Sequence, residues 1–160
     1  MLSDTPWAAT PTLRTRRTLT ATIDLATGHA GRATVLGARP GDADPDGVLD
    51  GIDTDPDAAV LAVTVLWSPA WSSADLGALA ARLGPGRLLF VEPTAGLGWR
   101  RVLQRALAPV FRRLLGHDFD RDVPAELRRA GFLVTAVDRF HTDRAGILSY
   151  AYGEAIRRSR

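Results

Sequence analysis

Residues 83–93 read LGPGRLLFVEP, and this stretch indicates the fold. Its Gly-Pro-Gly triplet is a turn signal that ends a preceding helix pattern. The run Leu88–Val91 is wholly apolar, as expected of a strand that is covered on both faces of a parallel sheet. Glu92 and Pro93 end the run. A buried strand entered from a helix through a tight turn is typical of α/β proteins.

The neighbouring segments repeat this alternation. Residues 59–66 (AVLAVTVL) predict a second buried strand. Residues 73–83 predict a helix with Ser73 as its N-cap and apolar residues at helical spacing. Residues 99–115 predict a longer helix, which Pro109 should kink or split in two.

The carboxyl-terminal part predicts a short helix and two strands. Residues 121–130 form the helix pattern, and Gly131 closes it. Residues 132–140 and 147–153 predict strands joined by so few residues that they must be antiparallel. We therefore predict an α/β fold with a Rossmann-like sheet, mostly parallel, that ends in an antiparallel hairpin.

The amino-terminal part is less regular. Residues 1–15 are expected to form a flexible arm, and residues 18–28 (TLTATIDLATG) predict a strand that ends at a glycine turn. Residues 33–37 predict a second short strand, and residues 38–57 are rich enough in Gly, Asp and Pro to predict mostly loop. We expect one domain, residues 16–156, with residues 154–160 fraying and 157–160 as its tail.

Composition excludes several classes of protein. The 160 residues are 46% hydrophobic and 24% charged, which is ordinary for a globular domain. There is no cysteine, so neither a disulfide nor a thiolate metal site can form. No apolar run approaches the length of a membrane span, and no secretory leader is recognised, so we predict a cytoplasmic protein without an integral membrane segment. The net charge of +2 and the absence of interleaved aromatic residues argue against nucleic acid as a partner.

Residues 58–152 resemble the second half of a class I S-adenosylmethionine-dependent methyltransferase. The resemblance is to the small-molecule branch that includes the ubiquinone and menaquinone biosynthesis enzymes. It rests on the order of three pieces: the turn and strand of residues 83–93 with a terminal acid, a long helix, and residues 123–132 (VPAELRRAGF), which contain the "Ala-Gly-Phe" entry to the next strand. The resemblance implies a methyl transfer from S-adenosylmethionine to a small-molecule substrate.

The resemblance also implies candidate cofactor-binding residues. In residues 23–31 (IDLATGHAG), Asp24 and Gly28 match the family's first motif, which holds the cofactor backbone, although Ala30 stands where a glycine is usual. Asp53 in a Gly-Ile-Asp sequence and Asp42 in a Gly-Asp-Ala sequence match two acids that hold polar groups of the cofactor, but their order is reversed relative to the family. Trp67, which follows a strand, would contact the adenine base. No catalytic residue is assigned.

Length limits what the resemblance implies. The family places about two helices and two strands between its first motif and its fourth strand, and each such unit needs roughly 30 residues. Residues 29–58 contain too little chain for both. Either the cofactor half is reduced, or Asp24 and Gly28 are not the first motif. The alternative to an active methyltransferase is thus a pseudoenzyme: a non-catalytic interaction module, or a homodimeric remnant of the fold that covers an open sheet edge.

Other residue patterns give weaker signals. His29, His117 and His141 are far apart and are interpreted as capping or surface residues, and no cluster has the spacing of metal ligands. Trp67 and Trp71 follow a strand end, where they line a ligand crevice or cap the core. The predicted helix at 99–115 carries five arginines and no acid. We interpret it as core packing with a solvated arginine face, the alternatives being a substrate lid, a dimer face or a membrane-surface contact.

Overall fold

The computed structural model describes residues 19–30, 33–36, 45–50, 52, 59–115, 120–142 and 147–158. Its helices and strands, in chain order, are α1 (Leu19–Ala30), β1 (Ala33–Leu36), α2 (Pro45–Asp50), β2 (Ala59–Val63), α3 (Ser73–Leu83), β3 (Arg87–Pro93), α4 (Trp99–Leu115), α5 (Val123–Arg129), β4 (Phe132–His141) and β5 (Ser149–Arg157). The predicted amino-terminal arm lies outside the described residues.

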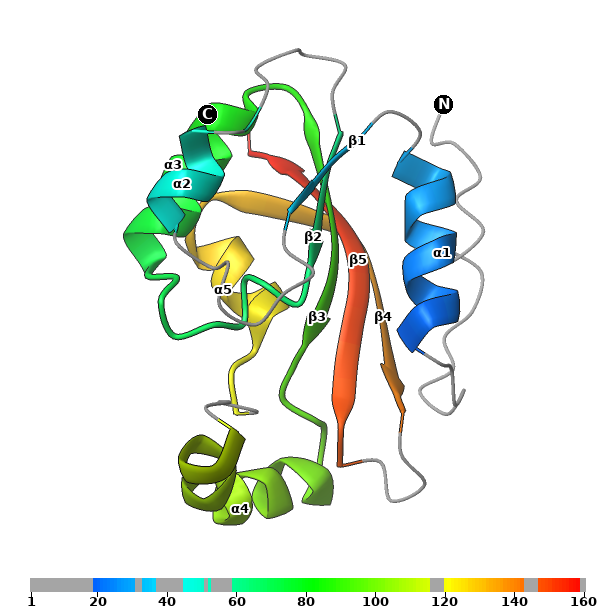
Figure 1. Ribbon diagram of the computed structural model, residues 1–160, viewed down its shortest axis with the longest axis vertical. Helices are drawn as coiled ribbons and strands as arrows, with labels where there is room; N and C mark the ends of the chain where they lie inside the picture. Colours follow the sequence, from blue (N-terminus) through cyan, green and yellow to red (C-terminus); the bar gives the residue numbers. More distant parts are fainter. Residues whose placement is uncertain are drawn as a thin grey trace.

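The strands form one mixed sheet with the order β1-β2-β3-β5-β4 (Figure 1). β1, β2 and β3 are parallel, and β5 pairs antiparallel with both β3 and β4. The predicted α/β sheet with a terminal antiparallel hairpin is therefore confirmed. The last strand continues to Arg157, so the expectation that it ends at Gly153 and that the chain frays from residue 154 is wrong.

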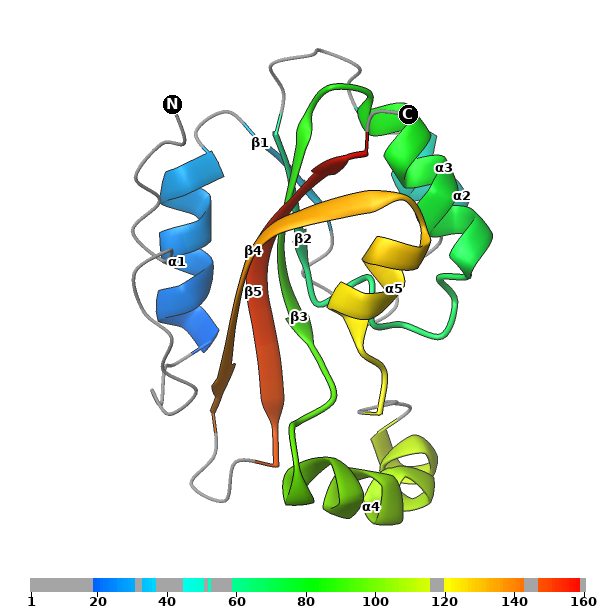
Figure 2. The same ribbon diagram turned by 180° about the vertical axis from the view of Figure 1, so that it is seen from behind.

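Helices cover both faces of the sheet, in three layers. Among the described helices, Figures 1 and 2 show α2, α3 and α5 on one face and α1 on the other. The prediction that residues 18–28 form a strand is wrong, because α1 occupies this segment. Thr22 and Ala26, four residues apart, are buried on one side of α1. The second face of β2 and β3 needs an apolar cover, and this tertiary requirement outweighs the β-propensity of threonine and isoleucine.

Residues 38–57, predicted to be mostly loop, contain one short helix in their described part. α2 begins there at Pro45, a residue well suited to the first position of a helix because its missing N–H would have no partner in any case. Leu49 on α2 and Ile52 just after it are buried in the core on the α3 side. Burial of these apolar side chains stabilises a short helix that composition alone does not predict.

The start of α3 is shifted by one residue from the prediction. Ser72, not Ser73, is the N-cap, and its side-chain oxygen accepts a hydrogen bond of 3.3 Å from the Asp75 N–H. The Asp75 carboxylate accepts the Ser72 N–H at 2.8 Å, which completes a capping box. The Ser72 hydroxyl also donates to this carboxylate at 2.6 Å, and this bond, together with the one from the Ser72 N–H, holds the pKa of Asp75 below its usual value.

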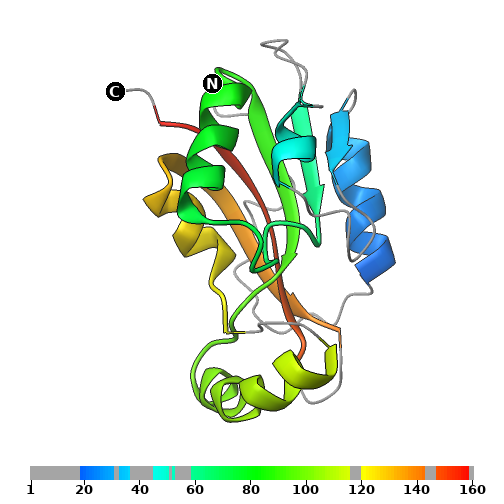
Figure 3. The ribbon, with the colours of Figure 1, turned by 60° about the vertical axis from the view of Figure 1, so that its left-hand side comes forward.

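The interpretation of the 99–115 helix as core packing is wrong. Val102 and Val110 of α4 are 69% and 50% exposed, whereas Gln104 and Ala108 are buried. Figure 3 shows α4 at one end of the molecule, beyond the end of β3 and not on a face of the sheet. Pro109 lies within α4, which remains one helix. Apolar periodicity predicts a helix here, but it does not predict whether the apolar face has a partner.

Two glycines shape the carboxyl-terminal hairpin. Gly131, at φ 97°, adopts the left-handed conformation that ends α5, as predicted. Gly153 on β5 lies opposite an irregularity in β4 between Val134 and Ala136. A Cβ at Gly153 would overlap the Ala136 carbonyl oxygen and come within 2.7 Å of Cζ of Phe90. The close approach of β4 to β5 therefore requires glycine here.

No helix within the described ranges is long and apolar enough to cross a bilayer.

Candidate functional site

The buried side chain of Glu92 organises the loop that follows β2. Glu92 lies near the end of β3 and has no exposed surface. Its Oε1 accepts the backbone N–H groups of Val65 and Leu66 at 3.0 and 3.1 Å, and its Oε2 accepts that of Trp67 at 3.3 Å. The carboxylate thus fixes the path of the chain where β2 ends, at the edge of the sheet where open α/β proteins bind ligands.

Burial raises the pKa of Glu92 to about 7, because removal from water disfavours the charged form. The three N–H donors and the nearby positive charge of Arg121 act in the opposite direction but do not cancel this effect. Glu92 therefore titrates near neutral pH while it holds the loop. A buried carboxyl group with such a perturbed pKa is a feature of functional sites, although structural networks also produce it.

The same loop contains a strained residue that positions Trp67. Thr64 has φ 49°, a conformation that β-branched residues rarely adopt. Its N–H donates to the Val91 carbonyl at 3.0 Å, and its own carbonyl accepts the Trp67 indole N–H at 2.7 Å. Trp67 is 7% exposed, so its ring packs mainly in the core while part of it reaches the surface.

Arg121 binds the next part of the loop. Its guanidinium donates to the Ser68 carbonyl, to the Trp71 carbonyl at 2.6 Å and to the Glu126 carboxylate at 2.6 Å. Trp71 is buried, and its indole nitrogen has no hydrogen-bond partner. Arg121 follows α4 in sequence, so this contact joins two loops about fifty residues apart.

A hollow of about 610 Å³ lies beside this loop. Its volume falls within the range of small-molecule sites, roughly 300–1,000 Å³. It combines aromatic surface, the amino-terminal end of α3, and groups of both charges, which suit a polar molecule carrying charges of both signs. The lining residues are Trp67, Pro69, Trp71, Ser72, Ser73, Asp120, Arg121, Glu126 and Arg129.

A second network ties the loop after β3 to the hairpin. Arg139 of β4 donates to the Ala95 carbonyl at 2.9 Å and pairs with the Asp122 carboxylate at 3.0 Å. Gln104 of α4 accepts the Gly96 N–H at 2.6 Å and donates to the Ile147 carbonyl at 2.5 Å. These bonds account for the burial of a glutamine on α4.

The structure separates the predicted cofactor residues. Asp24 and Gly28 lie on α1, and both are exposed. Gly28 is near the carboxyl end of α1, beside the amino end of β1, whereas Trp67 follows the carboxyl end of β2 (Figure 1). The expected glycine turn is thus a helical segment. Asp42 and Asp53 lie outside the described residues, so their roles stay predictions.

Among the three histidines, the structure describes the side chain of His141. His117 lies outside the described residues, as does the side chain of His29. His141 borders a cavity of only about 20 Å³ between the loop after β3 and the hairpin, room for little more than one water molecule. In the part of the chain that the structure describes, no group of three or more His, Cys, Asp or Glu residues is placed to hold a metal ion.

Sequence reasoning did not identify Glu92 and Arg121 as site residues. An acid at the end of an otherwise apolar strand is visible in the sequence, but its three N–H donors come from a loop about 25 residues earlier. Arg121 is one of 20 basic residues, and no sequence signal distinguishes it from the others.

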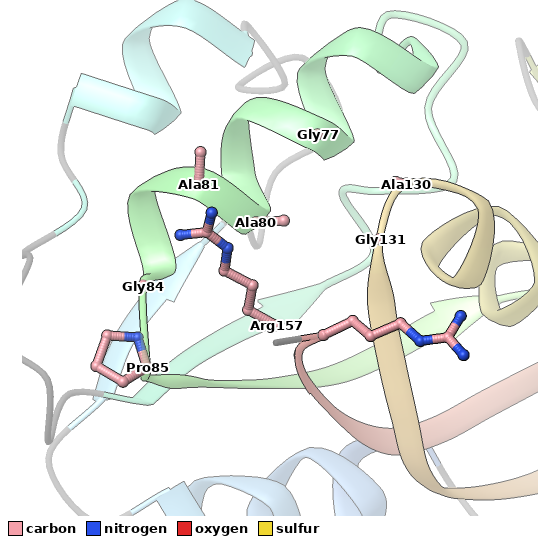
Figure 4. A pocket seen from close by; sticks show the side chains of 9 residues that line it. Gly77, Ala80, Ala81, Gly84, Pro85, Ala130, Gly131 and Arg157 are labelled. Carbon is pink, nitrogen blue, oxygen red and sulfur yellow. The ribbon is translucent and has the colours of Figure 1, made fainter. Parts of the chain in front are cut away.

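A separate hollow of about 540 Å³ lies at the opposite edge of the sheet. It is formed by small residues of α3 and of two turns, including Ala80, Gly84 and Gly131, together with Arg157 and Arg158 at the end of β5. Figure 4 shows the Arg157 side chain extended toward α3, close to Ala81. This edge carries the amino ends of the parallel strands, so it is not where ligands of such sheets usually bind.

Comparison with known proteins supports the fold alone. No family model matches the sequence, and no curated protein matches it. Among solved structures, LepI in complex with SAM is similar, with a TM-score of 0.50 and 10% identity over 91% of this chain and 42% of the LepI chain. A LepI variant in complex with SAH and a substrate analogue, and a structure described as a pericyclic reaction enzyme, each have a TM-score of 0.47 with the same identity and coverage.

The five-stranded mixed sheet and the likeness to LepI define a domain with a methyltransferase-like α/β fold. The chain corresponds to 42% of the length of the LepI chain.

Proposed function

We propose that this chain is an S-adenosylmethionine-dependent methyltransferase-like domain that acts on a small molecule at the carboxyl edge of its parallel strands. The loop held by Glu92 supports this proposal most directly. Three backbone N–H bonds to one buried carboxylate keep the loop rigid beside a hollow of ligand size. Rigid positioning matters because methyl transfer depends mainly on holding the nucleophile in line with the methyl donor.

The described residues fit only part of the cofactor. Trp67 offers aromatic surface at the end of β2, against which an adenine ring could stack. A carboxylate is also needed for the ribose hydroxyls. Glu92 cannot serve, because both of its oxygens accept N–H groups of the loop, and Asp24 projects from α1. The role therefore falls to Asp42 or Asp53, and no step of the reaction is assigned to a particular residue.

Calorimetric titration of S-adenosylmethionine and of its homocysteine product into the purified protein tests the proposal. We expect saturable heat with at least one ligand, and weaker binding in either Asp42→Asn or Asp53→Asn. Asp57→Asn is the matched control, since it removes one charge from the same acidic stretch. Absence of heat and of a thermal shift at about millimolar ligand, where even weak complexes form, would contradict the proposal.

The exposed edge of β1 favours a second candidate, a non-catalytic module that pairs with another copy of the chain. β1 has four residues and stands at the edge of the sheet, and Val35 is 54% exposed. Unpaired edges are usually covered or paired. Measurement of mass in solution separates the candidates: a monomer that binds S-adenosylmethionine supports the enzyme, and a dimer that does not bind it supports the module.

A further inference from the structure

An apolar stripe runs along the side of α4 that faces away from the protein. Trp99, Val102, Ala106 and Val110 follow one another at intervals of three and four residues, so they share one helical face. Trp99 is 63% exposed, Val102 69% and Val110 50%, and Ala106 is exposed as well. Buried Gln104 marks the other side of the helix. We call these four residues the α4 stripe.

Positive charge borders the α4 stripe. Residues 99–113 contain five arginines and no acid. Among the described residues, Arg101 and Arg105 both pair with Asp120, which lies outside the helix, at 3.8 and 3.1 Å. Arg100 lies over the Trp99 ring, 5.6 Å from its centre. A partner that matches this surface must therefore offer both apolar contact and negative charge.

A second copy of the chain matches this surface poorly. In a two-fold contact each surface meets itself, so the arginines of the two copies would face one another. The stripe is also a single row of side chains, whereas a stable protein interface buries roughly 800 Å² on each partner. Figures 1 and 3 show α4 at the end of the molecule, where a flat surface can approach it.

We infer that the α4 stripe docks onto an anionic membrane surface. Helices that lie in the membrane interface combine an apolar face with basic flanks. Tryptophan favours the headgroup region, and arginines near the helix pair with acidic lipids. In the docked state Val102 and Val110 enter the acyl boundary, Trp99 lies at the headgroups, and Arg113 contacts lipid phosphates. This docking is independent of cofactor binding.

Vesicle co-sedimentation without S-adenosylmethionine tests the inference. We expect the protein to sediment with vesicles of phosphatidylcholine mixed with phosphatidylserine and not with phosphatidylcholine alone, and added salt should release it. Val102→Glu should weaken binding more than about tenfold, since it removes apolar contact and adds a repelled charge. Arg113→Gln should weaken it about fivefold.

Leu133→Glu and Arg158→Gln are matched controls on β4 and beyond β5, and both should sediment like the unaltered protein, because these exposed residues lie away from α4. Equal sedimentation of Val102→Glu and the unaltered protein would overturn the inference, as would failure to bind acidic vesicles. A dimer in solution that Val102→Glu dissociates would assign the stripe to a second copy. Binding to polyglutamate but not to vesicles would assign it to an acidic protein. Either result would also overturn the inference.

Discussion

Replacement of Glu92 by glutamine should remove the pH dependence of folding stability that comes from the ionisation of this buried carboxyl group. Glutamine has the shape and the neutral charge of protonated glutamate. Its side-chain oxygen can still accept the N–H groups of Val65 and Leu66, as Oε1 of Glu92 does. Its amide nitrogen, unlike a carboxyl oxygen, cannot accept the Trp67 N–H. We therefore expect Glu92→Gln to be less stable than the unaltered protein by about 1 kcal/mol at low pH, where Glu92 is protonated.

The two proteins should differ as pH rises. Burial raises the pKa of Glu92 from 4.5 to about 7. Between these values the folded state binds the proton more tightly than the unfolded chain, so the free energy of unfolding falls as pH increases. Each pKa unit corresponds to about 1.4 kcal/mol, so the shift corresponds to about 3 kcal/mol. Between low pH and pH above 7, the difference in stability should therefore move by about that amount in favour of Glu92→Gln, which becomes the more stable protein.

Urea unfolding of both proteins, followed by tryptophan fluorescence from about pH 4.5 to about pH 8, measures this difference. Other titrating groups are common to the two proteins and cancel in it. A difference that stays constant across this window would refute the reasoning, because Glu92 would then have the same pKa in the folded and unfolded states. A change with pH in the opposite direction would mean that the N–H donors and Arg121 outweigh burial.

Three further changes test other contacts. Glu92→Ala leaves the N–H groups of three loop residues without their acceptor, and each loss costs about 1 kcal/mol or more. Urea unfolding at low pH should therefore show that the free energy of unfolding falls by about 3 kcal/mol. A fall of less than about 1 kcal/mol would mean that water replaces the carboxylate. Gly153→Ala should lower the free energy of unfolding by about 1–3 kcal/mol or more, because the added methyl group overlaps the Ala136 carbonyl. An unchanged melting temperature would contradict this close approach of the two strands. Gly28→Ala should raise the free energy of unfolding by about 0.5–1 kcal/mol, since the position is helical with open space around it. If calorimetry shows that this substitution also abolishes binding of S-adenosylmethionine, Gly28 does contact the cofactor.

The sequence by itself determined the carboxyl-terminal half of the fold. Residues 59–63 and 88–91 are apolar without interruption, as expected of strands that are covered on both faces. Gly131 and the short connection between the last two strands likewise leave few alternatives. These signals are local, because each depends on the backbone preferences or burial of neighbouring residues.

Only the tertiary structure decided the role of residues 18–28. Their threonines and isoleucine favour a strand, but the uncovered face of β2 and β3 requires a helix, and Thr22 and Ala26 pack there. The tertiary structure also decided the surroundings of α4. Its apolar face is evident in the sequence, but Val102 and Val110 on this face are exposed in the structure. Periodicity reports that a face is apolar, whereas its partner is set by distant segments.

The candidate site depends even more on tertiary contacts. Trp67 could be proposed from its place after a strand, but Glu92 becomes a loop anchor only because β3 lies beside β2. Its raised pKa is likewise a property of its burial and not of its sequence neighbours. The sequence thus specified the strands and their ends, and the packing of those strands decided which side chains meet at the edge where a ligand would bind.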